Sequence, residues 1–190
     1  IDDIETKDWG NHLAPTAFVY MMTGDDTHLA KIDKMLEASL DFYEAAYAKC
    51  ETWSDAREHG VSHCHKRISW LAALDWVWND LAPARRLEHA ARMVDTLMRH
   101  REIYPRADQW FGEFYTADLL YWYAGVTCLD DGLDEESYAK TLTLLTTGYK
   151  DQQMMFEVRE RLRQDDGALT PRLEYTLPAY PHPEFKFLYC

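Results

Sequence analysis

The sequence predicts an all-α fold built from antiparallel helical hairpins. Apolar residues recur every three or four positions through most of the chain, which is the period of an amphipathic helix. Short acidic turns that contain glycine separate these segments. The chain has 190 residues and 47% of them are hydrophobic, enough for one core. We therefore expect a single helical domain over 1–190, arranged as a bundle, a solenoid or an α/α toroid.

The first two predicted helices flank the turn at 23–26. One is expected over 11–22, with Pro15 near its first turn, where a missing N–H does little harm. The other runs to about residue 49 and has Asp26 or Thr27 as its N-cap. Its apolar residues step by three and four: Leu29, Ile32, Leu36 and Leu40. The polar stretch that follows, to about residue 62, is predicted to be a loop.

The middle of the chain predicts three more helices, over 65–81, 83–101 and 112–129. Pro83 stands where a first-turn proline belongs. The helix over 112–129 is apolar almost all round, so we expect it to be buried on most sides. Four tryptophans in these helices are expected in the core: Trp70, Trp76, Trp78 and Trp122.

Two helices are predicted after the acidic turn at 130–132, over 135–147 and 150–163, the first of them capped by Asp134. The remaining segment, 168–190, contains four prolines and several tyrosines. Prolines exclude a regular helix, so this segment is predicted to be a long Pro/Tyr-rich loop.

Charge and motifs exclude several classes of function. The net charge of −13 repels phosphate backbones, so nucleic acid is not an expected partner. No run approaches the ~20 apolar residues that span a bilayer, so no membrane association is expected. The chain has no glycine-rich phosphate loop, no dinucleotide fingerprint and no serine nucleophile elbow, and we expect no cofactor. The four cysteines are widely spaced and do not indicate a compartment.

Three passages, taken in order, resemble one enzyme family. The first is the apolar helix that ends in Thr23-Gly24-Asp25. The second is the alanine-rich stretch with Asp75-Trp76, followed by Leu81 and a basic helix start. The third comprises Ala124-Gly125, the turn at 130–132, and Asp166-Gly167 with the downstream Tyr175. Together they are similar to the helical part of heparinase II/III-like polysaccharide lyases, from about residue 13 to about residue 185.

This resemblance implies an incomplete α/α toroid that belongs to a larger domain, with a C-terminal β-rich domain elsewhere in the same parent chain. It implies cleavage of a uronate-containing glycan by β-elimination, so the expected partner is an anionic polysaccharide or oligosaccharide. A periplasmic or secreted location is implied as well. The family often carries an Asn or Asn-His in the helix that corresponds to 109–124, and this chain has neither there.

β-Elimination at a uronate needs a group that neutralises the C5 carboxylate, a base for the C5 proton and an acid for the leaving O4. Tyr175 matches the family's Asp-Gly…Tyr arrangement and is the first candidate for acid or base. His182, held between two prolines, is its candidate partner, as are His63 and His12.

Substrate-binding candidates are chosen by chemistry and by their places near predicted helix ends. Asn11 and Arg67 could neutralise a carboxylate, Arg67 through its bidentate guanidinium. Aromatic rings near loops could stack on sugars. The full set of binding candidates is Asn11, Arg67, Trp9, Trp110, Glu113 and Tyr115.

The densest group of ligand-type residues contains His59, His63, Cys64 and His65. The sequence has no second cluster of such residues at the spacing typical of zinc sites, so no metal site is assigned. Whether these histidines bind a metal stays open.

Two other functions compete with the lyase. A toroid glycoside hydrolase would need paired carboxylates on opposite sides of one bond, and Glu113 with Asp118, or Asp130-Asp131, would be candidates. A non-catalytic helical domain that binds a glycan or a protein is the other alternative. The missing Asn near Trp110 favours that second alternative.

Overall fold

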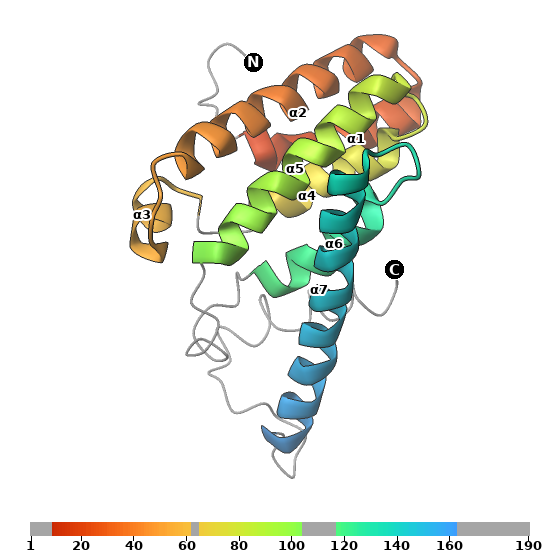
Figure 1. Ribbon diagram of the computed structural model, residues 1–190. Helices are drawn as coiled ribbons and strands as arrows, with labels where there is room; N and C mark the ends of the chain where they lie inside the picture. Colours follow the sequence, from red (N-terminus) through yellow and green to blue (C-terminus); the bar gives the residue numbers. More distant parts are fainter. Residues whose placement is uncertain (1–8, 62–64, 104–116, 163–190) are drawn as a thin grey trace.

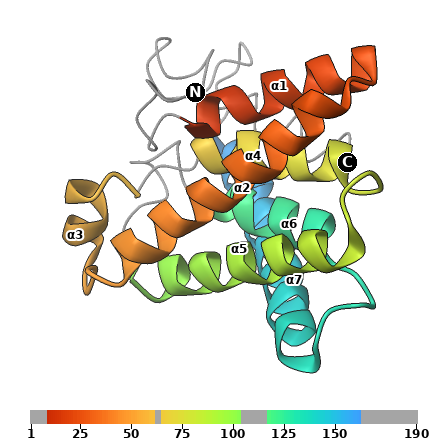
Figure 2. The same ribbon diagram turned by 90° about the horizontal axis from the view of Figure 1, so that it is seen from above.

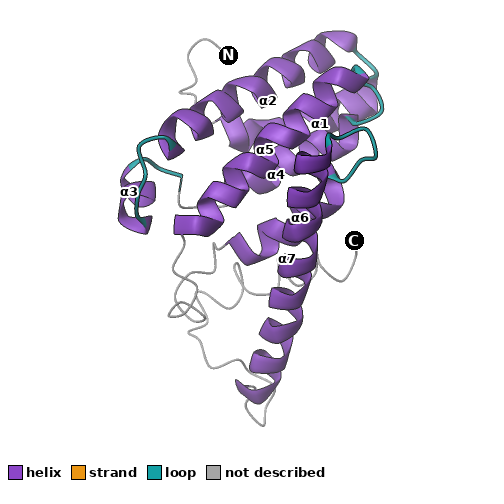
Figure 3. Cartoon of the chain, in the orientation of Figure 1, coloured by secondary structure: helices purple, strands orange, loops and turns teal. Residues whose placement is uncertain are grey.

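Seven helices make up the regular structure of the computed structural model, which describes residues 9–61, 65–103 and 117–162 (Figure 1). Within these ranges every regular element is a helix, as Figure 3 shows, so the all-α prediction is confirmed. The helices are α1 (Trp9–Thr23), α2 (Asp26–Tyr47), α3 (Trp53–Glu58), α4 (His65–Val77), α5 (Pro83–Ile103), α6 (Ala117–Cys128) and α7 (Glu135–Leu162).

The six longer helices pack in two layers. One layer contains α1, α4 and α6, in which α1 contacts α4 and α4 contacts α6. The other contains α2, α5 and α7, and here α2 contacts α5 and α5 contacts α7. The α1–α2 and α6–α7 hairpins each join one layer to the other. Seen from above in Figure 2, α1 lies at one edge of this array.

The core fills the space between the layers. Its fully buried side chains come from both of them and include Leu36 and Leu40 of α2, Trp70 and Leu74 of α4, and Met93 and Leu97 of α5. The indole of Trp70 also donates to the Leu36 carbonyl at 3.1 Å, so its polar atom is satisfied inside the core. Trp122 is buried as predicted and Trp78 is half-buried, but Trp76 is 40% exposed, so its assignment to the core was wrong.

A short helix occupies part of the segment that was predicted to be a loop. Thr52 is the N-cap of α3: its hydroxyl accepts from the Asp55 amide, and the Asp55 carboxylate accepts from the Thr52 amide at 2.8 Å. This reciprocal pair is a capping box, and it satisfies two amides that would otherwise lack partners. The polar composition of the stretch concealed this signal.

The two helices predicted over 135–147 and 150–163 form one continuous helix, α7. Gly148 lies between the two predicted ranges and is part of this helix. Its missing side chain lets α6 approach, because a Cβ at Gly148 would lie 2.3 Å from the Trp122 backbone nitrogen. At Gly125 a Cβ would lie 2.5 Å from the Leu145 Cα. Close packing against α6 therefore outweighs the weak helix propensity of glycine.

Two helix starts also differ from prediction. Asp25, rather than Asp26 or Thr27, is the N-cap of α2, and its carboxylate accepts from the Thr27 amide at 2.9 Å. α1 begins at Trp9, so Pro15 lies inside it and not in its first turn. Asp134 caps α7 as predicted, since it accepts from the Ser137 amide at 3.0 Å. The predicted loop at 168–190 lies outside the described residues.

Candidate functional site

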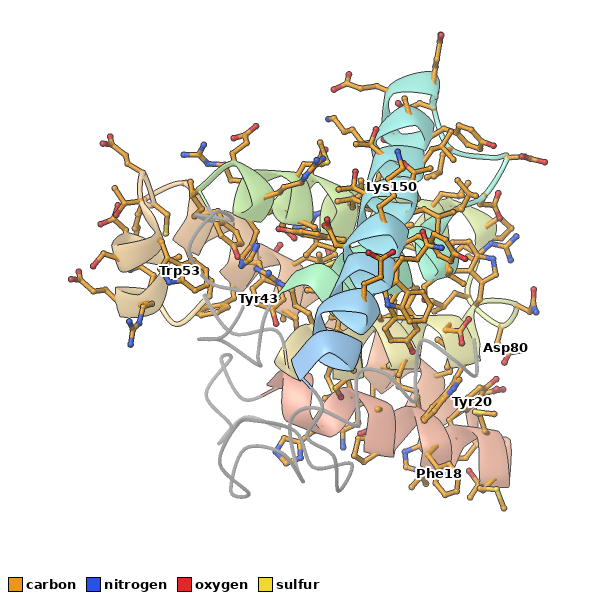
Figure 4. All side chains as sticks on the ribbon, turned by 90° about the horizontal axis from the view of Figure 1, so that it is seen from below. Phe18, Tyr20, Tyr43, Trp53, Asp80 and Lys150 are labelled. Atoms are coloured by element: carbon orange, nitrogen blue, oxygen red, sulfur yellow. The ribbon has the colours of Figure 1, made fainter. Side chains whose placement is uncertain are left out.

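A buried cluster of polar and aromatic side chains surrounds Arg67 in the first turn of α4. Arg67 is fully buried, and its guanidinium carbon lies 4.5 Å from the ring centre of Tyr43 and 5.0 Å from that of Tyr47. These two tyrosines are four residues apart on α2, so both rings lie on one face of that helix. Figure 4 labels Tyr43 and Trp53, two residues of this region.

Hydrogen bonds connect the arginine to the backbone through Tyr47. The Arg67 Nη2 donates to the Tyr47 hydroxyl oxygen. That hydroxyl in turn donates to the carbonyl of Val61 at 2.9 Å. The phenol is thus held between a charged donor and a backbone acceptor, which fixes its position and polarises its O–H bond.

His100 brings the end of α5 and the middle of α6 into the same cluster. Its Nδ1 shares a 3.0 Å hydrogen bond with the Tyr121 hydroxyl. The imidazole also packs edge-to-face on Tyr47, with ring centres 6.1 Å apart, and on Trp53, with ring centres 5.5 Å apart. His100 and Tyr121 are both fully buried.

The arrangement places the three chemical types that uronate elimination needs in one region. Arg67 is a cation with the geometry to bind a carboxylate in a bidentate way. His100 and Tyr121 form a hydrogen-bonded pair that could pass a proton between them. We name this group, consisting of Arg67, Tyr43, Tyr47, His100 and Tyr121, the Arg67 cluster.

Of the two predicted site residues whose side chains the structure describes, Arg67 belongs to this cluster and His12 does not. His12 lies on α1 with its side chain exposed, whereas the cluster is buried, so the structure does not bring them together. Trp9 and Asn11 belong to the first turn of α1, and their side chains are outside what the structure describes. Six candidates lie outside the described residues altogether: His63, Trp110, Glu113, Tyr115, Tyr175 and His182.

Sequence reasoning missed the partners of Arg67. Tyr43, Tyr47, His100 and Tyr121 come from three different helices, and each occupies a position that reads as ordinary helix core. The one available signal was the spacing of Tyr43 and Tyr47, which places two polar-tipped aromatic rings on the same helix face.

A second buried histidine lies where α2 packs against α5. His89 is fully buried, and its Nε2 donates to the Asp33 carboxylate at 2.6 Å. Arg85 donates to the same Asp33 oxygen at 3.2 Å and to Glu37 and Glu88 at 2.9 Å each. Burial lowers the pKa of His89 and outweighs the opposing effect of Asp33. Burial alone would raise the pKa of Asp33, but the hydrogen bonds from His89 and Arg85 hold it below its usual value.

This α2–α5 network therefore joins a neutral imidazole to an ionised carboxylate, a stable arrangement that connects two helices. Its ionic groups pair with one another, as expected of a structural element. Asp130 is structural as well: its carboxylate accepts from the Gly132 amide at 2.7 Å within the turn before α7.

The described residues contain no group of three His, Cys, Asp or Glu side chains that could hold a metal ion. The side chains of His63 and His65 are outside what the structure describes, so the question of metal binding by this histidine group stays open. Among the described helices, none is both long and apolar enough to cross a membrane.

Comparison with models of protein families, with curated proteins and with solved structures finds no match for this chain. The similarity to heparinase II/III-like lyases therefore rests on the sequence motifs quoted above.

Proposed function

We propose that this chain belongs to a polysaccharide lyase that cleaves a uronate-containing glycan by β-elimination, and that the Arg67 cluster supplies its chemistry. One observation carries the proposal: the buried guanidinium of Arg67 lies in the same cluster as the hydrogen-bonded pair of His100 and Tyr121. The sequence motifs that resemble heparinase II/III-like lyases agree with it. The sequence candidates Tyr175 and His182 stay as expected contributors to the same chemistry.

The reaction assigns one role to each group. Arg67 binds the C5 carboxylate, which makes the C5 proton more acidic because the developing negative charge is stabilised. His100 takes the C5 proton, the C4–C5 double bond forms, and the C4–O4 bond breaks. Tyr121 gives its phenolic proton to O4 and recovers a proton from His100 along their 3.0 Å hydrogen bond. The glycan is cleaved, and both side chains return to their starting protonation states.

The two-layer packing supports the proposal that the helices form an arc of an α/α toroid. In such an arc, successive hairpins lie side by side, with one helix of each in an inner layer and the other in an outer layer. The order α1–α4–α6 in one layer and α2–α5–α7 in the other matches that pattern.

One observation favours a second candidate function, a non-catalytic helical domain. Arg67, His100 and Tyr121 are fully buried, so a polymer reaches them only if the cluster opens. In a binding domain these same contacts would serve to fix the packing of α2, α4, α5 and α6.

The test uses the protein with a panel of glucuronate, galacturonate, mannuronate and guluronate polymers, and follows the ultraviolet absorbance of the C4–C5 double bond. Arg67→Lys keeps the charge but removes the bidentate fork, and we expect a loss of about tenfold or more in kcat/KM. Arg85→Lys is the matched control, because Arg85 binds carboxylates of the α2–α5 network outside the proposed site. Absence of unsaturated product from every polymer would contradict the lyase and leave the binding domain.

A further inference from the structure

The outer side of α1 carries large apolar side chains that the described helices leave exposed. Phe18 is 55% exposed, Met21 is 54% and Met22 is 71%, and the spacing of three and four residues places them together on one side of the helix. Trp76 of α4 extends the surface, since its ring lies edge-on to Phe18 with centres 6.4 Å apart. We name the exposed residues Phe18, Val19, Met21, Met22 and Trp76 the α1 apolar face.

Acidic groups border this face. Asp25 lies in the turn after α1 and Asp26 is the first residue of α2, and both are exposed. Burial raises the pKa of Tyr20 of α1, and the nearby carboxylates of Asp80, in the turn between α4 and α5, and of Asp26 raise it further. Figure 4 shows Phe18, Tyr20 and Asp80 on the same side of the molecule. Helix α1 itself contains no Lys and no Arg, so it adds no permanent positive charge beside these carboxylates.

We propose that the α1 apolar face binds a basic amphipathic helix of a partner polypeptide. The apolar stripe of such a helix would cover Phe18, Met22 and Trp76, and its flanking Lys or Arg side chains would approach Asp26 and Asp80. Exposed methionines suit this role because their unbranched side chains adapt to the shape of a partner. A helix laid along α1 would cover apolar side chains that the contacts of α1 with α2 and α4 leave exposed.

The negative charge beside the α1 apolar face favours a basic helix over a second copy of the chain or an anionic lipid surface. A second copy of the chain would bring its own aspartates against these, and each copy carries a net charge of −13. An anionic lipid surface would be repelled for the same reason. A positively charged helix is attracted, and its association would weaken with added salt.

The experiment measures the fluorescence anisotropy of a labelled synthetic helix made only of Leu and Lys, titrated with the protein. Saturable binding is expected, and the double variant Met21→Ser/Met22→Ser should weaken it about tenfold. The matched control is Val126→Ser/Leu142→Ser, which removes two exposed apolar side chains from α6 and α7 and should leave binding unchanged. All four residues are exposed, so these variants are expected to fold.

Three results would overturn the proposal. The first is the absence of binding, and the second is an equal loss in both double variants, which would indicate attraction by overall charge alone. The third is a concentration-dependent dimer in sedimentation that Met21→Ser/Met22→Ser dissociates, because the face would then be occupied by a second copy.

A peptide with Glu in place of Lys tests the acidic border separately. It should show no binding, and binding of that peptide would contradict the role of the border.

Discussion

Two arginine–histidine clusters in this chain surround their guanidinium groups with different partners. In the α2–α5 network, Arg85 pairs with the carboxylates of Asp33, Glu37 and Glu88, and His89 donates to Asp33. In the Arg67 cluster, the described contacts of the guanidinium are a phenol oxygen and the faces of two tyrosine rings. The first set neutralises charge and joins helices. The second set brings the guanidinium together with tyrosine hydroxyl and histidine imidazole groups, which are groups that acid–base chemistry uses.

The largest expected effect is on the free energy of unfolding, and it differs between Arg67 and Arg85 because only Arg67 is fully buried. Arg67→Ala would leave a cavity between the rings of Tyr43 and Tyr47, and we expect the free energy of unfolding to fall by about 3 kcal/mol or more. Arg85→Ala removes a side chain that is 29% exposed, and its ion pairs are partly screened, so we expect a loss of about 1 kcal/mol. Urea denaturation measures both values. Equal losses would contradict the comparison.

The next effect concerns the close packing of α6 against α7, which depends on side-chain size and involves no charged group. Gly148→Ala would force a Cβ to within 2.3 Å of the Trp122 backbone nitrogen, so α6 and α7 would have to separate. We expect a loss of about 2 kcal/mol, the usual cost of overpacking. Thr143→Ala on the exposed side of α7 is the control and should change stability little. A neutral Gly148→Ala would show that the two helices do not approach so closely.

The pH dependence of stability tests the α2–α5 network. The pKa of His89 in the folded chain lies below its ordinary value of 6.5, because burial disfavours the charged imidazole. The unfolded chain therefore binds a proton first on acidification, and stability present above about pH 6.5 is lost as the pH falls below it. Further acidification adds the loss from Asp33, whose folded pKa lies below its ordinary value.

Thermal unfolding at a series of pH values between neutral and mildly acid measures this loss. His89→Gln keeps a donor toward Asp33 but does not titrate, so its melting temperature should fall less over the same interval. If both proteins lose the same amount, the histidine does not contribute to the pH dependence.

The smallest effect on stability is expected at a second, more exposed set of ion pairs between α2 and α5. Arg92 pairs with Asp41 at 2.6 Å and with Glu44 at 2.7 Å, but both carboxylates are substantially exposed. Arg92→Ala should cost at most about 1 kcal/mol, and the difference should shrink in high salt because exposed pairs are screened. Urea denaturation at low and high salt checks both statements, and a loss as large as that of Arg67→Ala would contradict them.

The sequence predicts the helices well because their apolar period is strong, and the boundary residues Pro83 and Asp134 act as expected. It fails where local and tertiary signals disagree. Gly148 is a weak helix former, but close packing against α6 keeps α7 continuous. The capping box of Thr52 and Asp55 was present in the sequence, but the polar composition around it favoured a loop.

The candidate site was predicted less completely than the fold. Arg67 was identified from its chemistry and its place at a helix start. Tyr47, His100 and Tyr121 were not, because each lies on a separate helix and only the packing of the helices brings them together. Such a juxtaposition leaves no local pattern in one sequence.

The most direct test of the account compares two Tyr→Phe variants in the ultraviolet assay for unsaturated product. Tyr121→Phe removes the hydroxyl that hydrogen-bonds to His100, whereas Tyr20→Phe removes a hydroxyl on α1 that lies near Asp80 and outside the cluster. With a uronate polymer that the protein cleaves, we expect Tyr121→Phe to lower kcat about a hundredfold or more and Tyr20→Phe to leave it unchanged, with both variants folded by circular dichroism. Full activity in Tyr121→Phe would contradict the assignment of the Arg67 cluster as the catalytic site.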